Sequence, residues 1–241
     1  QKRILVEFVS SNPTGPLHVG HGRGAAYGDA LVRVLRASGY DAASEYYIND
    51  AGRQMDILAV SVFLRYLELC GEEFEFPANA YQGDYVFDIA ASLYRDLGED
   101  LRQPLDAIIG SLPTDGDQLL DTLISRAKTL LGKECFTRIH DLARDTLVDD
   151  IREDLSQFGV TFDHWFSENT LVTGNAVARV VEKLTENGLM YEKDGALWLR
   201  TTDYGDEKDR VVIRANGNHT YFATDIAYHL HKFERGFDHA I

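Results

Sequence analysis

SNPTGPLHVGHGRG, residues 11–24, joins an apolar strand predicted at Arg3–Val9 to a helix predicted at about 18–37. Two histidines, His18 and His21, stand three residues apart at the helix start and therefore share one helix face. The first turn of a helix carries free backbone N–H groups and the positive end of the helix dipole. The stretch therefore predicts an anion site, for which phosphate is the natural ligand.

The residues that follow complete a βαβ unit and lead into further alternating elements. A second strand is predicted at Ala42–Ile48, after a helix end that Gly39 can cap. We expect the two strands to be parallel, because a helix between neighbouring strands makes a right-handed crossover. Periodicity then predicts helices at 55–69, 87–97, 119–130, 135–158, 176–187 and 221–233, and strands at 160–166, 197–200, 210–214 and 240–241.

These elements indicate an α/β fold in five segments. Residues 1–54 form the first βαβ unit, residues 55–134 a helical insertion, and residues 135–168 a helix and strand that return to the sheet. Residues 169–219 form a small α+β insertion, and residues 220–241 a helix followed by the start of the next strand.

Composition limits the function. The chain carries 24 Lys and Arg residues against 39 Asp and Glu, a formal charge of −15, which argues against wrapping nucleic acid with its whole surface. It has no run of eighteen apolar residues and no signal peptide at QKRILVE, so we expect no membrane span and a cytoplasmic location. Cys70 and Cys135 lack a CxxC partner, which argues against a disulfide framework or a zinc ribbon. Because the chain lacks an initial Met, we expect a piece of a longer protein.

From its residues alone, the histidine turn allows several interpretations. His18 and His21 could simply cap the helix, and a metal site would need a third ligand that is not nearby. The stretch Gly20-His-Gly-Arg-Gly-Ala25 formally fits the GxGxxA fingerprint of NAD-dependent oxidoreductases, with Glu45 as a ribose ligand. In that fingerprint the first glycine directly follows the strand, whereas about ten residues with two prolines intervene here.

Five sequence blocks resemble those of bacterial arginyl-tRNA synthetases, a family of class I aminoacyl-tRNA synthetases. The blocks are VEFVSSNPTGPLHVGHGRG (6–24), EYYINDAG (45–52), YQGDY (81–85), FDHWFSE (162–168) and YFATDIAY (221–228), in family order. They cover nearly the whole chain. The resemblance implies the first part of a Rossmann-like catalytic domain, in which residues 169–219 are a connective-peptide-like insertion.

The resemblance also implies ATP-dependent activation of L-arginine and its transfer to the 3′-terminal ribose of tRNA(Arg). His18 and His21 would be the catalytic residues that stabilise charge on the phosphoryl oxygens. The ATP-binding set would be Thr14, Gly15, Pro16, His18, Gly20 and His21. The arginine-binding set would be Glu7, Ser10, Asn12, Glu168, Tyr221 and Asp225, whose carboxylates suit the planar guanidinium group.

Each of these residues also has a purely structural alternative. Glu7 could face a polar layer, Glu168 could lie in an exposed turn, and Asp225 could cap or pair locally. Four residues at the end of the second strand either line the cleft or shape the turn; these are Tyr46, Tyr47, Asn49 and Asp50.

Two departures from the family limit the prediction. The sequence contains no Lys-rich KMSKS-type loop, and the family's N-terminal and anticodon-binding domains lie outside it, so we expect the stretch alone to be inactive. A noncatalytic fragment or paralogue is the alternative function. Mg²⁺ is expected with the ATP phosphates, without a structural metal held by the protein. We expect a monomer without membrane partners.

Overall fold

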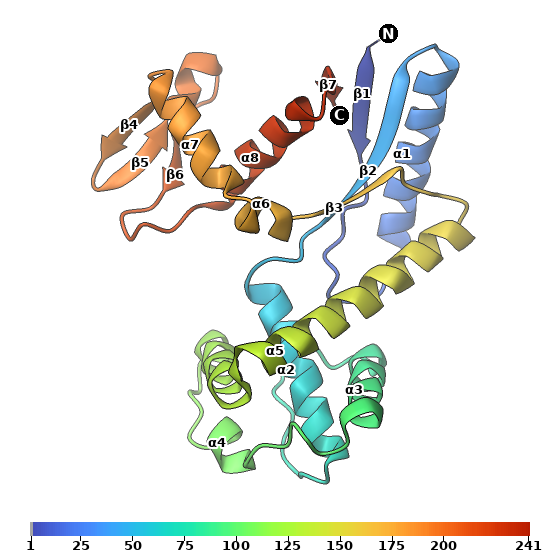
Figure 1. Ribbon diagram of the computed structural model, residues 1–241, viewed down its shortest axis with the longest axis vertical. Helices are drawn as coiled ribbons and strands as arrows, with labels where there is room; N and C mark the ends of the chain where they lie inside the picture. The colour runs from blue at the N-terminus through green and yellow to red at the C-terminus, as the bar shows by residue number, and fades with distance from the viewer. Residues whose placement is uncertain (1) are drawn as a thin grey trace. The chain divides into compact units, whose positions relative to one another are not determined.

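The computed structural model describes residues 2–241, except for the side chain of Val172, and its chain divides into two compact units (Figure 1). The first unit comprises the chain up to Ser10, together with Arg23–Tyr47 and Thr161–Ile241. The second unit comprises Ser11–Gly22 and Ile48–Val160. The histidine turn therefore groups with the second unit. The predicted division into five segments stays a prediction.

A parallel sheet forms the base of the first unit. The strand β1 (Arg3–Glu7) lies between β2 (Asp41–Ile48) and β7 (His239–Ala240) and is parallel to both. With β3 (His164–Ser167) the strand order is β3-β2-β1-β7. The helix α1 (Val19–Ala37) connects β1 to β2, which confirms the predicted parallel βαβ unit and the α/β class.

The third strand begins later than predicted because of Asp163. The predicted strand covered 160–166, whereas β3 covers His164–Ser167. The Asp163 carboxylate accepts hydrogen bonds from the Ser44 backbone N–H at 2.7 Å, the Ser44 hydroxyl at 2.8 Å and Arg36 Nη2 at 2.7 Å. Burial alone would raise the pKa of Asp163, but these bonds and the Arg36 charge lower it. Asp163 thus fastens the start of β3 to β2.

A small antiparallel sheet and three helices complete the first unit. The sheet has the order β4-β5-β6, and α7 packs against α8 beside it. The sequence analysis missed β4, whose outer residues Glu192 and Lys193 are polar and exposed. The elements are α6 (Asn169–Thr173), α7 (Ala176–Glu186), β4 (Met190–Lys193), β5 (Ala196–Leu199), a 3₁₀ turn (Thr201–Tyr204), β6 (Arg210–Ile213) and α8 (Tyr221–Glu234).

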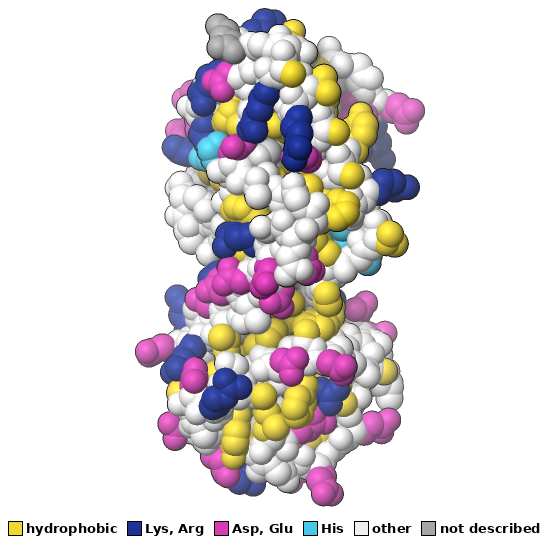
Figure 2. Space-filling view, turned by 90° about the vertical axis from the view of Figure 1, so that its right-hand side faces the viewer, with side chains coloured by type: hydrophobic (Ala, Val, Ile, Leu, Met, Phe, Trp, Pro, Cys, Tyr) yellow, Lys and Arg dark blue, Asp and Glu magenta, His cyan; other side chains and the backbone are white. Residues whose placement is uncertain are grey.

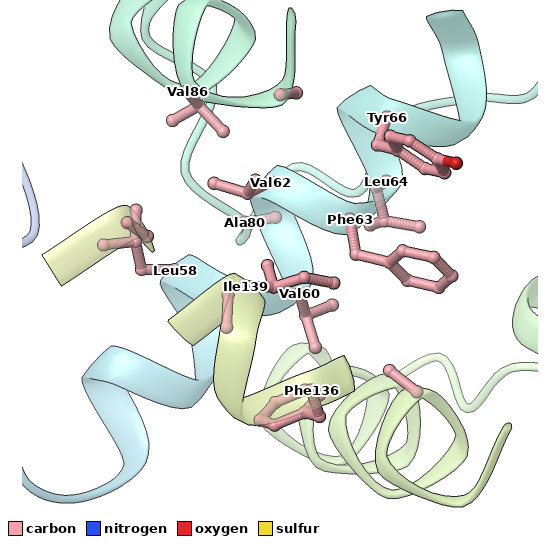
Figure 3. Packing of buried hydrophobic residues seen from close by; sticks show 14 of the residues in the cluster. Leu58, Val60, Val62, Phe63, Leu64, Tyr66, Ala80, Val86, Phe136 and Ile139 are labelled. Atoms are coloured by element: carbon pink, nitrogen blue, oxygen red, sulfur yellow. The ribbon is translucent and has the colours of Figure 1, made fainter. Parts of the chain in front are cut away.

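The second unit is helical and is built around α2. Apolar side chains cover nearly all sides of α2, and such a helix must be enclosed by others. Figure 3 shows Leu58, Val62 and Phe63 of α2 among side chains of neighbouring elements, including Val86 and Ile139. The elements are α2 (Arg53–Leu69), α3 (Asp84–Leu97), α4 (Leu105–Ile109) and α5 (Gly116–Gln157).

The long helix α5 combines two predicted helices. The sequence analysis predicted separate helices at 119–130 and 135–158, whereas α5 runs from Gly116 to Gln157. At Gly132 the backbone departs from helical geometry, with φ 71° and ψ 168°. Positive φ is accessible to glycine without a side-chain clash. The predicted break therefore exists as a kink at one glycine.

The connection between β1 and the histidine turn is strained. The predicted strand reached Val9, but β1 ends at Glu7, since Val9 and Ser10 adopt φ values of 66° and 45°. Two successive residues with a side chain in the left-handed region are uncommon and are typical of functional sites.

Phe8 sits beside this connection and requires a glycine on α1. A Cβ atom built on Gly28 would lie 2.1 Å from Cγ of Phe8. The Phe8 ring also packs against Phe162, with 4.4 Å between ring centroids. Close approach of the Phe8 ring to the α1 backbone thus fixes the end of β1 against the helix.

We expect Gly28→Ala to destabilise the chain by about 1–3 kcal/mol, because the added methyl group must displace the Phe8 ring. Gly24→Ala is the matched control on the same helix, since a Cβ there meets nothing within 4 Å. It should be neutral or stabilising by up to about 1 kcal/mol. Urea unfolding measures both variants, and equal unfolding free energies would contradict the packing described.

Candidate active site

Glu7, at the end of β1, is the centre of a polar cluster in the first unit. Its Oε2 accepts a hydrogen bond from Lys232 Nζ of α8 at 2.7 Å, and its Oε1 accepts one from the Ser10 hydroxyl at 3.1 Å. The Ser10 hydroxyl oxygen in turn accepts the backbone N–H of Tyr47 at 3.1 Å. The Ser10 hydroxyl group is therefore held by one hydrogen bond that it donates and one that it accepts.

Tyr47 links this group to a second acid, Glu168. Burial raises the pKa of Tyr47, and the charge of Glu168, together with a hydrogen bond to that carboxylate, raises it further. Weaker contributions come from Asp225 and Glu7. The Tyr47 hydroxyl is thus a neutral donor beside three carboxylates. Glu168 directly follows β3 and is 8% exposed.

Asp225 lies on α8, one turn after Tyr221. Partial burial raises the pKa of its carboxyl group, His229 opposes this shift, and the Glu7 charge adds to it. The side chain of Asp225 nevertheless keeps access to solvent, and Tyr221 is 80% exposed. Both residues are thus accessible to a ligand in this unit.

The cluster is rich in acids. Glu7, Glu168 and Asp225 carry a formal charge of −3, and Lys232, which pairs with Glu7, carries +1. His229 does not change this balance near neutral pH, since burial and the Lys232 charge lower its pKa. Such a cluster favours a cationic ligand.

A second buried pair supports the cluster. Glu45 is fully buried, and it accepts the Tyr228 hydroxyl at 2.6 Å and Arg235 Nη1 at 2.5 Å. Burial and the bond to Glu45 raise the pKa of Tyr228, so its hydroxyl remains a donor. The alternative in which Glu45 binds a ribose is therefore wrong, because both carboxylate oxygens are engaged inside the protein.

The two histidines stack on each other in the second unit. Their ring centroids are 3.7 Å apart, with an interplanar angle of 24°. Nδ1 of His21 accepts the backbone N–H of His18 at 3.2 Å, and Nδ1 of His18 accepts that of Gly20 at 3.1 Å. In the neutral rings the proton therefore resides on Nε2, which serves as a donor toward a ligand. Burial and the neighbouring His18 lower the pKa of His21, which favours its neutral form.

Gly20 allows this stacking. A Cβ atom on Gly20 would lie 2.9 Å from Cε1 of His18, closer than such atoms approach. Any larger residue would therefore displace the His18 ring. The sequence analysis placed Gly20 in the ATP-binding set. Its close approach to the His18 ring is a second reason for a glycine at this position.

The residues before His18 are tied to the helices of the same unit. Asn12 Nδ2 donates to Gln54 Oε1 at 2.7 Å, and the Tyr85 hydroxyl donates to the Thr14 carbonyl at 2.7 Å. Asn12 thus groups with the histidine turn, and its assignment to arginine stays a prediction. Gly15 packs against the Tyr85 hydroxyl.

Among residues 2–241, no group of three or more His, Cys, Asp or Glu side chains is arranged to hold a metal ion. Within the same residues, no helix combines the length and apolar character that crossing a membrane requires.

Acidic and basic side chains are interspersed on the face presented in Figure 2.

Comparison with known proteins assigns the family. The model of class I tRNA synthetases (R), catalytic domain, matches residues 1–85 and 117–241. The chain belongs to the class I arginyl-tRNA synthetase family. It is 57% identical to an arginine–tRNA ligase of Thioalkalivibrio sulfidiphilus and 54% identical to one of Legionella pneumophila, over all of this chain. In both cases it spans 42% of the relative's length.

Solved structures agree with this family. A structure described as an arginyl-tRNA synthetase from Campylobacter jejuni is similar over the whole chain, with a TM-score of 0.80 and 34% identity, and the match covers 47% of that protein. The Thermus thermophilus arginyl-tRNA synthetase shares the fold over 95% of this chain and 36% of its own, with a TM-score of 0.60 and 24% identity. The alternative of an NAD-dependent oxidoreductase is therefore not supported.

In this chain, Glu7, Ser10, Glu168 and Asp225 come together in one unit. The histidine turn, with Thr14, Gly15 and Pro16, forms a coherent element in the other unit. Near the end of β2, Tyr47 joins the cluster, whereas Tyr46 is buried in the core and stacks on Trp165 with 4.5 Å between centroids.

The sequence analysis missed the cations of α8. Lys232 and Arg235 were not singled out, although they follow Asp225 at helical spacing, at positions i+7 and i+10. Polar residues at that spacing usually form a solvated helix face. The signal that could have found them is the pair of acids, Glu7 and Glu45, on two neighbouring buried strands, since buried acids require cationic partners.

We expect Lys232→Met to destabilise the synthetase chain by about 3 kcal/mol, because the substitution leaves the Glu7 carboxylate without its buried cation. Arg33→Met is the matched control, as it removes an exposed partner of Asp29 and should leave stability nearly unchanged. Adding Glu7→Gln to Lys232→Met should restore part of the loss. Thermal and urea unfolding measure these effects. An unchanged free energy of unfolding in Lys232→Met would show that the Lys232–Glu7 pair does not hold α8 in place.

Proposed function

We propose that this chain is part of an enzyme that activates L-arginine with ATP and transfers it to the 3′-terminal ribose of tRNA(Arg). The observation that carries the proposal is the cluster of the acids Glu7, Glu168 and Asp225 in a chain over half identical to proteins named arginine–tRNA ligase. Because the chain spans 42% of those relatives, the activity is proposed for the protein that the complete gene encodes.

The cluster suits the arginine side chain. A guanidinium group is planar, permanently charged and carries five N–H donors, which carboxylates satisfy best. Asp225, accessible on α8, and Glu168, buried at the end of β3, offer acceptors from two elements of one unit. The charge of a bound cation would also lower the pKa of Asp225, because it favours the ionised carboxylate.

Ser10 is proposed to hold the amino-acid backbone groups. Its hydroxyl stands between Glu7 and the Tyr47 amide, at the carboxyl end of β1 where open α/β sheets bind ligands. The left-handed φ of Ser10 directs the chain away from the sheet at this point.

The histidine turn is proposed to bind ATP. During activation the arginine carboxylate attacks the α-phosphorus, a bond to pyrophosphate breaks, and charge develops on the phosphoryl oxygens. Donors fixed in advance stabilise such charge. With Nδ1 engaged in the turn, His18 and His21 each present Nε2–H for this purpose. Gly15, Pro16 and Gly20 complete the proposed ATP-binding set.

Mg²⁺ is proposed to accompany the ATP phosphates. The described residues gather no metal-binding group, so we assign it no protein ligand and derive no step through it. Monomeric state and cytoplasmic location stay predictions. We further propose that the 241-residue stretch alone does not aminoacylate tRNA, since its sequence contains no KMSKS-type loop.

Two substitutions in the complete protein should separate the two ligands in arginine-dependent ATP–pyrophosphate exchange, measured with tRNA present. Asp225→Asn removes a carboxylate and should raise the KM for arginine by about 10–100-fold while leaving the KM for ATP nearly unchanged. His21→Ala should instead lower kcat by about 10²–10³-fold, since a donor to the phosphoryl oxygens is lost.

Asp203→Asn is the control, because Asp203 is an exposed acid of the same unit outside the cluster. Equal changes in both KM values for Asp225→Asn would contradict the assignment of the cluster to arginine. Near-wild-type exchange in His21→Ala would contradict the assignment of the turn to ATP. No exchange in the wild-type protein would favour a noncatalytic paralogue.

A further inference from the structure

The motif Tyr81-Gln-Gly-Asp-Tyr85 has no role in the function proposed so far. It stands where α3 begins, with Gly83 at the helix N-cap and Tyr85 in the first turn. It belongs to the same compact unit as the histidine turn, since both fall within Ser11–Gly22 and Ile48–Val160. Its contacts with that turn can therefore be described within one unit.

Tyr85 fixes the peptide group that follows Thr14. Its hydroxyl donates to the Thr14 carbonyl oxygen at 2.7 Å, while the Thr14 N–H donates to the Asn12 carbonyl at 2.8 Å. Thr14 is thus held on both sides, through its own amide and through its carbonyl. Burial and the neighbouring Tyr81 raise the pKa of Tyr85, so the hydroxyl remains protonated and available as a donor.

Two glycines accommodate the Tyr85 ring. A Cβ atom on Gly83 would lie 2.4 Å from Cε1 of Tyr85, and one on Gly15 would lie 3.3 Å from its hydroxyl oxygen. The ring therefore occupies a position that side chains at either glycine would disturb. Gly15 belongs to the turn and Gly83 to the motif, so both sequence blocks are adapted to the same tyrosine.

Other hydrogen bonds hold the turn before and after this contact. Asn12 donates to the exposed Gln54 before it, and the His18 and His21 rings bond to the backbone of the turn after it. The Thr14 bond thus links α3 of the helical unit to the segment that leads to the histidines, as the Asn12 bond links α2 to the residues before it.

We propose that Tyr85 is a positioning residue for the ATP-binding turn and that it sets the place of His18 and His21 by holding the Thr14 carbonyl. This inference rests on the proposed function, since it takes the turn to bind ATP. Tyr85 acts through Thr14 and needs no contact with the nucleotide. Small displacements of catalytic groups are costly, with roughly 10²-fold in rate for about 1 Å.

The structure separates this effect from arginine binding. Of the proposed arginine-binding residues, Asn12 belongs to the turn, whereas the other five lie in the other unit: Glu7, Ser10, Glu168, Tyr221 and Asp225. Loss of the Tyr85 bond should therefore weaken ATP binding and lower kcat while leaving the KM for arginine unchanged. General destabilisation of the protein would not produce that selectivity.

The test is Tyr85→Phe in the protein that the complete gene encodes, because this change removes only the hydroxyl group. Tyr81→Phe is the matched control from the same motif. Direct binding of MgATP is measured by calorimetry, arginine-dependent exchange supplies kcat and both KM values, and thermal unfolding monitors the fold. We expect Tyr85→Phe to weaken ATP binding about three- to tenfold, with the KM for arginine within about twofold of wild type.

Tyr81→Phe should leave all of these quantities near their wild-type values. Unchanged ATP affinity in Tyr85→Phe, or equal losses for ATP and arginine together with a lower unfolding temperature, would overturn the positioning role. If the wild type binds ATP without arginine-dependent exchange and Tyr85→Phe still weakens that binding, the proposed function fails while the role of Tyr85 stands. If the wild type does not bind ATP, both fail.

Discussion

The first unit depends on two acids that stand side by side on neighbouring strands, Glu45 fully buried and Glu7 partly buried. Glu7 of β1 and Glu45 of β2 are register partners, so their side chains point to the same face of the sheet and their charges repel. Lys232 of α8 and Arg235, directly after that helix, neutralise them one to one. Removing such charges from water is costly and requires close cationic partners. The requirement fixes α8 against the sheet.

The placement of α8 in turn creates the charge pattern of the site. Lys232 pairs with Glu7 and Arg235 pairs with Glu45. Tyr47 and Ser10 connect these acids to β1 and β2 by hydrogen bonds rather than by further charges. The result is an anionic cluster on a rigid scaffold, which is the arrangement that selects a permanent cation such as a guanidinium group.

The elements that depend on local sequence could be predicted. Period-3.6 patterns gave α1, α2 and α8 nearly to their ends, and the Pro/Gly turn after the first strand indicated the histidine site. Contacts between distant residues could not be predicted in this way. The Tyr85 hydroxyl and the Thr14 carbonyl are 71 positions apart, and Lys232 and Glu7 are 225 apart. The left-handed conformation of Val9 and Ser10 also has no local signal, since neither residue is a glycine.

The central claim is that carboxylates of the first unit recognise the guanidinium group of arginine. Its most direct test is a titration of the complete protein with L-arginine and with L-citrulline, whose side chain has nearly the same shape but carries a neutral urea group. The account predicts that citrulline binds about 10–100-fold more weakly, because charge-assisted hydrogen bonds to the carboxylates are lost. Equal affinity for the two amino acids would contradict it.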